Sequence, residues 1–369
     1  MNKQFMLFTI LVFFTGLYLG ILRIVIPVIE RQLGIAIAIS TLLPLVTFGF
    51  VKGSFNYLAG KLSDDIGRKW VLTIGWIMAL SSVILFFYIN LYVVFLISFF
   101  LAINQAFTWT TTVTSQIDIS GKSRAGLATG INEMSGYLGV ALGNLFASNL
   151  FSVSYVLLAI ISLTALLLSF SVMETKTLLS DPKEERVNYI SITGISLAGL
   201  IEKFVDSSFF ILIPTYLLLR HYSLFLIGIV VGSYTFTWAL SQPLFGYIAD
   251  VTGKRRLITS LGFVIMFLGF LDYSAYPILF SIVEGLGMGM LYPNLIALVN
   301  DVVHESVRGK ALGYYRLYRD SGYGAAGIIL PILYSILGFN STLLVAGVFQ
   351  LIAILLLIGK LPSRFTLRS

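Results

Sequence analysis

The sequence predicts an all-α membrane protein of twelve transmembrane helices, arranged as two similar bundles of six. Three observations support this prediction. The 369 residues are 57% hydrophobic and only 11% charged, whereas roughly a quarter of the residues of soluble domains are charged. A short charged motif occurs twice, half a chain apart, and one polar segment divides the apolar runs six and six.

The apolar runs are long enough to cross a bilayer, because a helix needs about 20 apolar residues to span the hydrocarbon core. Charged residues, glycine and proline interrupt the runs and set their boundaries. In chain order the predicted spans are 5–29, 35–59, 70–89, 91–116, 124–148, 153–173, 189–218, 223–245, 257–275, 277–300, 310–336 and 340–359. The polar segment after the sixth span predicts a first bundle at 1–174, a linker at 175–188 and a second bundle at 189–369.

The basic residues predict the orientation in the membrane. Of the 24 lysines and arginines, 17 lie in the tails, the central linker or the even-numbered loops, whereas the opposite loops contain only Arg31 and Arg220. Basic loops stay in the cytoplasm, so we expect a plasma-membrane protein with both termini and the linker cytoplasmic. The same scattered distribution argues against a nucleic-acid partner.

The repeated motif consists of glycine, three residues, aspartate, two residues, glycine and two basic residues. Its first copy is Gly60, Asp64, Gly67, Arg68 and Lys69, and its second copy is Gly246, Asp250, Gly253, Lys254 and Arg255. The glycines predict tight turns between helices, and the aspartates are suited to accept hydrogen bonds from exposed helix N-terminal amides. We expect the basic residues to pair with Asp118 and Asp301, which end the fourth and tenth spans. A second motif, beginning at Arg124 and at Arg308, repeats at nearly the same offset.

In these motifs the chain resembles the major facilitator superfamily of membrane transporters, whose signature loop follows the second helix. Segments 104–109, 131–137, 291–294 and 315–323 also resemble a prokaryotic branch of drug and metabolite exporters. The resemblance implies two six-helix bundles with a substrate site between them near the middle of the membrane. It also implies that the charged motifs form a latch, made when the protein opens outward and broken when it opens inward. A stable turn with topogenic charge is the alternative.

The chain differs from the family pattern at three positions. Asp65 and Val251 stand where the signature has a basic residue, so part of the family's charge network is missing or inverted. Asn144 stands where the antiporter motif of the fifth helix would have proline. This last difference weakens the expectation of export by antiport.

In the family, the first, fourth, seventh and tenth helices line the cavity. The resemblance therefore implies a cavity lined by Arg23, Asn104, Gln105, Trp109, Thr112, Asp206, Glu284, Tyr292 and Asn294. Such a lining suits a small amphipathic or weakly ionic organic solute. Each aromatic residue could instead face lipid, and Arg23 either pairs within the protein or meets an anionic group.

Several charged residues fall inside predicted spans, where a charge usually faces a partner or a wet cavity. Three acids and three bases lie at similar depth and predict buried ion pairs: Glu202, Lys203, Asp206, Arg316, Arg319 and Asp320. Glu284 has no base beside it in the sequence and is the first candidate for a coupling-proton site. Asp206, Glu202 and Glu133 follow, and the counterpart of Glu133 in the second half is Arg316.

These observations favour a secondary transporter that moves a small organic solute by alternating access, with proton-coupled export as the first hypothesis. The alternatives are an importer or facilitator of a metabolite and a membrane sensor that does not transport. An enzyme is not expected, because the two histidines, His221 and His304, lie near neither a Ser/Asp pattern nor metal-ligand spacing. The chain has no cysteine and no phosphate-binding loop. We expect no cofactor, no metal, and a monomer in the lipid bilayer.

Overall fold

The computed structural model describes residues 2–34, 37–149, 151–178 and 186–358. These residues form thirteen α-helices joined by short turns and 3₁₀ segments, and they contain no strand. The first group comprises α1 (Lys3–Gln32), α2 (Ile37–Asp65), α3 (Arg68–Leu85), α4 (Leu91–Ser120), α5 (Ala125–Asn149) and α6 (Ser154–Ser169). The second comprises α7 (Tyr189–Asp206), α8 (Ser208–Leu219), α9 (Leu224–Thr252), α10 (Arg255–Phe270), α11 (Pro277–Val302), α12 (Arg308–Leu337) and α13 (Phe339–Ile358).

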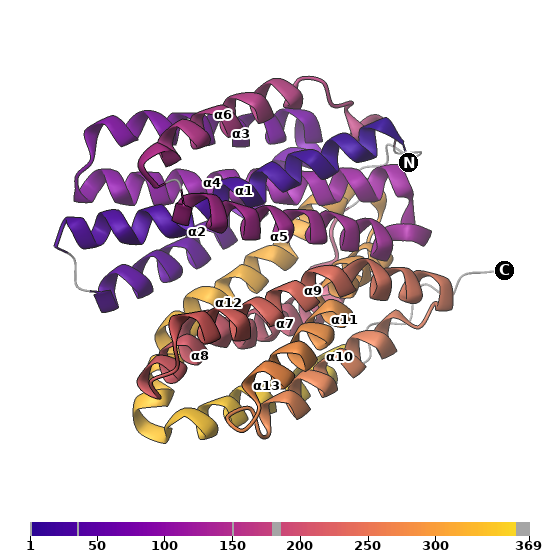
Figure 1. Cartoon of the computed structure of the whole chain (residues 1–369). Coiled ribbons are helices and arrows are strands. Elements are labelled where there is room, and N and C mark those ends of the chain that lie inside the picture. Colours follow the sequence, from indigo (N-terminus) through magenta and orange to yellow (C-terminus); the bar gives the residue numbers. More distant parts are fainter. Residues whose placement is uncertain (1, 35–36, 150, 179–185, 359–369) are drawn as a thin grey trace.

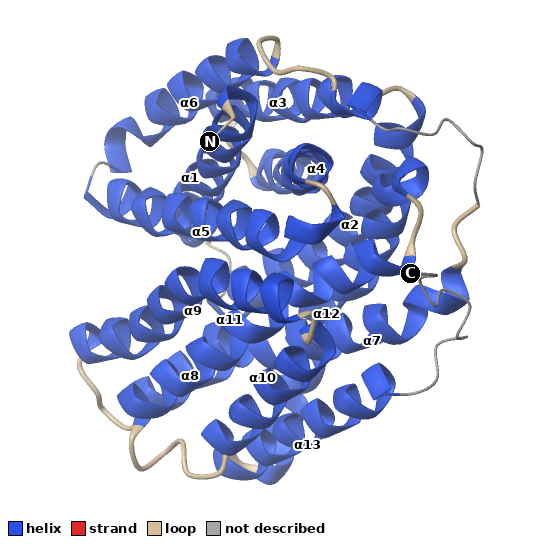
Figure 2. Cartoon of the chain, turned by 90° about the vertical axis from the view of Figure 1, so that its right-hand side faces the viewer, coloured by secondary structure: helices blue, strands red, loops and turns tan. Residues whose placement is uncertain are grey.

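The helices form two bundles, α1–α6 and α7–α13, which lie one above the other in Figures 1 and 2. Most helices pack mainly within their own bundle, but α2 and α12 pack most extensively on each other. The α2–α12 and α5–α9 contacts are the main ones between the bundles. The 3₁₀ segment Thr175–Leu178 begins the stretch predicted to be the linker. Residues 179–185 of that stretch, and residues 359–369 at the end of the predicted second bundle, lie outside the described residues.

The predicted twelve crossings are confirmed, although the seventh consists of two helices. Ser207 separates α7 from α8 but keeps helical angles (φ −62°, ψ −19°). Its amide donates to Lys203 O, and the Ile211 amide donates to Ser207 O, so hydrogen bonds continue across the break. Pro214 also removes one amide donor from α8. The two helices therefore make one crossing with a loosened backbone.

Seven helices of the described chain are each long and apolar enough to cross a membrane. They are α1, α3, α4, α9, α11, α12 and α13. The remaining crossings are shorter, as in α6 and α10, or contain more polar side chains, as in α5. In α5, Thr129, Asn132 and Glu133 are fully buried, so this crossing depends on the bundle to remain in the membrane.

Close helix contacts in the first bundle depend on glycine. A Cβ atom on Gly16 or Gly20 of α1 would collide with the α5 backbone at Gly136 and Val140. A Cβ atom on Gly143 of α5 would likewise overlap the α1 backbone. Small residues matter here because lipid provides no hydrophobic drive for helix association, which leaves close packing as the main attraction.

The two bundles approach most closely on one side of the molecule. There Gly60 of α2 lies against Gly309 of α12, and Gly126 of α5 lies against Gly246 of α9. Near the other end of α9, a Cβ atom on Gly228 would have nothing within 4 Å. We call the close side, which contains both copies of the charged motif, the charged-turn side. Figure 2 views the molecule from this side.

Candidate functional site

The charged motifs are partly helical. Gly67 and Gly253 have φ of +103° and +66° and lie at the ends of the turns. The prediction that Gly60 and Gly246 also form turns is wrong, because both lie inside long helices, α2 and α9. Each is instead a contact point between the bundles, where any side chain would push a helix of the other bundle away.

Asp64 of the first bundle caps a helix of the second bundle. Its Oδ1 accepts a hydrogen bond from the Gly309 amide (3.1 Å), and its Oδ2 accepts one from the Lys310 amide (2.6 Å). These amides belong to the first turn of α12, where no intrahelical acceptor exists and the helix dipole favours negative charge. Arg68 Nη1 lies 2.7 Å from Asp64 Oδ1 and holds the carboxylate in place. We call Asp64, Arg68 and the start of α12 the first latch.

Asp250 of the second bundle caps a helix of the first bundle in the same way. Its two oxygens accept hydrogen bonds from the amides of Gly126 (3.0 Å) and Leu127 (2.8 Å), in the first turn of α5. Arg255 Nη2 lies 2.8 Å from Asp250 Oδ1. Asp250, Arg255 and the start of α5 are the second latch. Each bundle thus supplies one aspartate and one helix N-terminus, and the charged-turn side is closed twice.

The arginines of both latches also reach the predicted aspartates. Arg68 Nε lies 3.1 Å from Asp118 of α4, and Arg255 Nε lies 2.9 Å from Asp301 of α11. Of the other basic residues of the motif, Lys69 donates to the carbonyl of Phe170 (2.7 Å) and Lys254 is exposed.

Two contacts that support the first latch were not predicted from the sequence. Arg308 pairs with Asp118 and so adds an ion pair between the bundles. The signal for it was present, because Arg308 repeats Arg124 in the second half. Glu174 accepts hydrogen bonds from the amides of Arg68 (2.9 Å) and Lys69 (3.0 Å) and so caps α3. Nothing in the sequence connects these two distant segments.

Changing Asp64 to asparagine should slow transport several-fold and leave membrane insertion intact. An amide retains one acceptor oxygen but turns its NH₂ group toward the second helix amide, and losing a helix cap costs about 1 kcal/mol. Initial rates in proteoliposomes, at equal amounts of inserted protein, measure the effect. The neighbouring Asp65→Asn change, at an exposed position, is the matched control. A wild-type rate in Asp64→Asn would argue against a latch.

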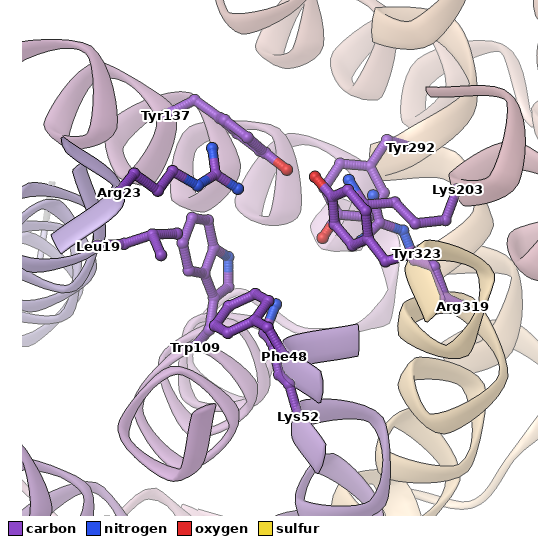
Figure 3. Close-up of a pocket in the computed structure, with 10 residues that line it drawn as sticks. All are labelled: Leu19, Arg23, Phe48, Lys52, Trp109, Tyr137, Lys203, Tyr292, Arg319 and Tyr323. Carbon is purple, nitrogen blue, oxygen red and sulfur yellow. The ribbon is translucent and has the colours of Figure 1, made fainter. Parts of the chain in front are cut away.

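A pocket lies between the bundles near the middle of the helices (Figure 3). Of the described residues, the first bundle contributes Leu19, Arg23, Phe48, Lys52, Trp109 and Tyr137, and the second contributes Lys203, Tyr292, Arg319 and Tyr323. Arg319 lies 11 residues after Arg308, where α12 begins, which corresponds to about 17 Å along the helix.

The pocket combines basic groups with aromatic rings. Lys203 Nζ lies 4.1 Å from the ring centre of Tyr323, and Arg319 Cζ lies 3.8 Å from that of Tyr292. Lys52 Nζ lies 5.7 Å from the ring of Trp109. Cations at these distances from aromatic faces are attracted by the ring electrons, more strongly where water is excluded.

Acidic residues beside the pocket pair with its bases. Lys203 Nζ lies 2.5 Å from Asp206 Oδ2, and Arg319 Nε lies 2.7 Å from Glu202 Oε2. Both pairs stay within the second bundle. They agree with the expectation of buried ion pairs among the intramembrane charges.

Two further pairs join the bundles. Lys52 of α2 lies 3.0 Å from Asp320 of α12, and Glu133 of α5 lies 2.8 Å from Arg316 of α12. The ion pairs predicted among the charges of the second half therefore extend to Lys52 and Glu133 of the first bundle. Asp320 also pairs with Arg319 within the second bundle, at 3.1 Å. Helix α12 lies at the boundary and exposes its charges to both bundles, so it forms ion pairs across the boundary as well as within its own half.

Of the nine residues expected in the cavity, six do not line this pocket. Asp206 and Glu284 are described below with the candidates for proton coupling, and the other four contact neighbouring groups. The Asn104 and Gln105 side chains donate to the carbonyls of Gly75 in α3 and Thr15 in α1, both at 3.0 Å. Thr112 donates within its own helix to Trp109 O (3.1 Å). Helix α4 lies in the middle of the first bundle (Figure 2), so its polar groups meet neighbouring backbones on most sides.

Asn294 is the fourth, and it contacts Arg255 of the second latch. Its amide donates to the carbonyls of Met290 (2.9 Å) and Phe245 (3.3 Å), and its oxygen lies 3.4 Å from Arg255 Nη1. Arg23, Trp109 and Tyr292 do line the pocket.

The candidates for proton coupling lie beside or away from the pocket. Asp206 accepts hydrogen bonds from Lys203 and from Tyr234, and Glu133 accepts one from Trp109 Nε1 (2.8 Å). Glu284 of α11 is fully buried, and its carboxyl group lies against Gly269 of α10. Neither of its carboxyl oxygens has a hydrogen-bond partner among the described residues.

Five lining residues were not assigned to the pocket from the sequence: Leu19, Phe48, Lys52, Tyr137 and Tyr323. Lys203 and Arg319 were expected only as members of buried ion pairs. Tyr137 and Tyr323 lie in segments 131–137 and 315–323, which were noted for their resemblance to exporters. That resemblance was the available signal for these two tyrosines. Leu19 and Phe48 carry no such signal, because a lone apolar residue in a span looks like any lipid-facing one.

Comparison with known proteins identifies the family. A family model described as "Major Facilitator Superfamily" matches residues 8–276 and 195–367. The chain is 28% identical over 142 residues to an "Uncharacterized transporter" of Buchnera aphidicola subsp. Schizaphis graminum, which covers 38% of this chain and 36% of that protein. It is 27% identical over 144 residues to "Inner membrane transport protein YajR" of Escherichia coli K12, which covers 38% and 32%. The matched part is thus about a third of each curated relative.

Two crystal structures share the fold. The human organic anion transporter MFSD10 (TETRAN) aligns with a TM-score of 0.85 at 14% identity, over 97% of this chain and 100% of that one. FucP in the outward conformation aligns with a TM-score of 0.79 at 13% identity, over 97% and 98%. Together with the apolar helices, these matches make the protein a multi-pass membrane protein. The chain belongs to the Major Facilitator Superfamily of membrane transporters.

Proposed function

We propose that the protein is a secondary transporter that moves a small organic solute by alternating access and couples this movement to protons. One observation carries the proposal: a charged, aromatic pocket lies between the two bundles, and two matching latches close its charged-turn side. The basic residues of that side support a cytoplasmic location for it. We further propose export across the plasma membrane, in line with the exporter-like segments 131–137 and 315–323.

The latches suggest how access alternates. While Asp64 and Asp250 cap α12 and α5, the bundles are held together on the charged-turn side. Loss of both caps would free the two helix N-termini, and the bundles would tilt apart there. The central ion pairs between α2, α5 and α12 would then act as the pivot.

The solute that we propose is an anion. The pocket is lined by four basic residues and by no acidic residue of the described chain. MFSD10, which shares the fold, is named an organic anion transporter. The aromatic rings beside the basic groups suit the organic part of such a molecule.

Glu284 is our candidate for the coupling proton. A carboxyl group inside the membrane normally has a partner, and Glu284 has no hydrogen-bond partner among the described residues. It lies on α11, the helix that also contributes Tyr292 to the pocket. Movement of α11 during transport would change the surroundings of this group and so its affinity for a proton.

Glu284→Gln tests this assignment. We expect proton-driven flux in proteoliposomes to fall and the remaining flux to lose its dependence on pH, because glutamine binds no proton. Glu30→Gln, at another buried glutamate near the far end of α1, is the control and should keep the pH dependence. If flux in Glu284→Gln varies with pH as in the wild type, the proton site lies elsewhere.

A facilitator or importer is the second candidate. Asn144 replaces the proline of the antiporter motif, and α5 continues as an unbroken helix through this position. Solute movement down its own gradient, at the same rate with and without a proton gradient, would favour this candidate.

A further inference from the structure

We infer that the transported solute carries a single net negative charge and that Arg23 of α1 binds its acidic group. This inference rests on the proposed transport function. It follows from a balance of the charges around the pocket, in which four bases have acidic partners and one has none in the described part of the chain.

The four paired bases are Lys52, Lys203, Arg316 and Arg319. Their partners are Asp320, Asp206, Glu133 and Glu202, at distances between 2.5 and 3.0 Å. All eight side chains are buried. A buried pair loses much of its stability when one partner is taken away, because the other charge remains without compensation. These four bases are therefore poorly suited to bind a further anion.

Arg23 differs from the other bases. It lines the pocket but forms no ion pair with any residue that the structure describes, and it is only half-buried. Its guanidinium carbon lies 5.6 Å from the ring centre of Phe210 on α8. This cation–π contact is with a neutral ring and does not compensate the charge of Arg23. Figure 3 shows the guanidinium directed into the pocket between Tyr137 and Trp109.

The balance defines the class of solute. With four pairs neutral and one arginine left over, the pocket has an excess of one positive charge, which one carboxylate, sulfonate or monoanionic phosphate group would compensate. A second negative charge would have to draw a base away from its buried acid. A neutral or cationic solute would leave Arg23 uncompensated in the closed pocket.

The organic part of the solute would lie beside aromatic rings. Trp109 and Tyr137 are in contact, with ring centres 5.6 Å apart, and Tyr137 also contacts Trp238. Figure 3 shows Arg23 beside Trp109 and Tyr137. An acidic group bound by Arg23 would therefore place a planar or apolar body against Trp109 and Tyr137. The expected solute is a small organic monoanion with such a body.

The test uses the full chain in proteoliposomes. Vesicles are incubated with a small-molecule extract of the expression host, to which benzoate, phthalate, benzamide and benzylammonium are added as probes. Solutes that accumulate relative to protein-free vesicles are identified by mass spectrometry, and their charge is read from electrophoretic mobility. We expect the wild type to accumulate only solutes with one negative charge, and Arg23→Gln to reduce this accumulation at least about tenfold, or ~1.4 kcal/mol.

The matched variants separate binding from structure. Arg23→Lys keeps the charge and should retain most of the accumulation. Arg220→Gln makes the same chemical change at an exposed arginine beside Tyr216 and should behave as the wild type. Accumulation of neutral, cationic or doubly charged solutes by the wild type would overturn the inference, even if Arg23→Gln did not fold. Wild-type accumulation by folded Arg23→Gln would do the same. If the folded wild type accumulates nothing, the proposed transport function fails and the inference fails with it.

Discussion

Replacing Arg316 by glutamine is expected to lower the free energy of unfolding by ~3–5 kcal/mol. The Arg316 side chain is buried, and its Nη2 lies 2.8 Å from Glu133 Oε1 on the other bundle. Without it, Glu133 remains a buried carboxylate whose nearest described donor is Trp109 Nε1, at 2.8 Å. One neutral hydrogen bond does not compensate a charge at this depth. The loss should therefore be much larger than for an ordinary surface change.

The double variant Glu133→Gln/Arg316→Gln isolates the cause. Two glutamines have no charge to compensate, and their amides can hydrogen-bond to each other, so this variant should be more stable than the single one. The stabilities of the wild type and the two variants are compared by the temperature at which each loses its monodisperse form on heating in detergent. A single variant as stable as the wild type, or a double variant as unstable as the single one, would show that the ion pair is not what stabilises this contact.

Gly60→Leu is expected to prevent closure of the charged-turn side and to lower the transport rate by at least about tenfold, or ~1.4 kcal/mol in the barrier. A Cβ atom at Gly60 would overlap the carbonyl oxygen of Gly309 and lie 2.9 Å from Gly313 Cα. Both neighbours are backbone and cannot rotate away. Helix α2 must then move from α12, and Asp64 loses its contacts with the start of that helix.

Spin labels measure this movement directly. The chain contains no cysteine, so Lys61→Cys and Lys254→Cys introduce one exposed label on each bundle without other changes. The distance between the labels should increase in Gly60→Leu. Gly228→Leu, where a Cβ atom has nothing within 4 Å, adds the same bulk to α9 and should leave distance and rate unchanged. An unchanged distance in folded Gly60→Leu would contradict the role assigned to this helix contact.

The roles of Gly60 and Gly246 show where local sequence reasoning fails. Both open a motif that contains charged residues and a second glycine, and such a motif suggests a turn. The turns are formed by Gly67 and Gly253, whose positive φ favours glycine. The other two glycines are needed because a helix of the opposite bundle passes too close for a side chain, and no local pattern reports that distance.

The sequence by itself determined the membrane class, the twelve crossings, the twofold repeat and the pairing of Arg68 with Asp118 and of Arg255 with Asp301. These depend on the length of apolar runs, on charges that end them, and on residues that repeat at one offset, all of which are properties of the chain read along its length. Only the tertiary structure decided that each aspartate caps a helix of the other bundle and that Glu133 meets Arg316. It also decided that Arg23 has no acidic partner among the residues that the structure describes. The physical reason is that a helix has faces on all sides. Which face meets the pocket, a neighbour or lipid depends on how thirteen helices pack together.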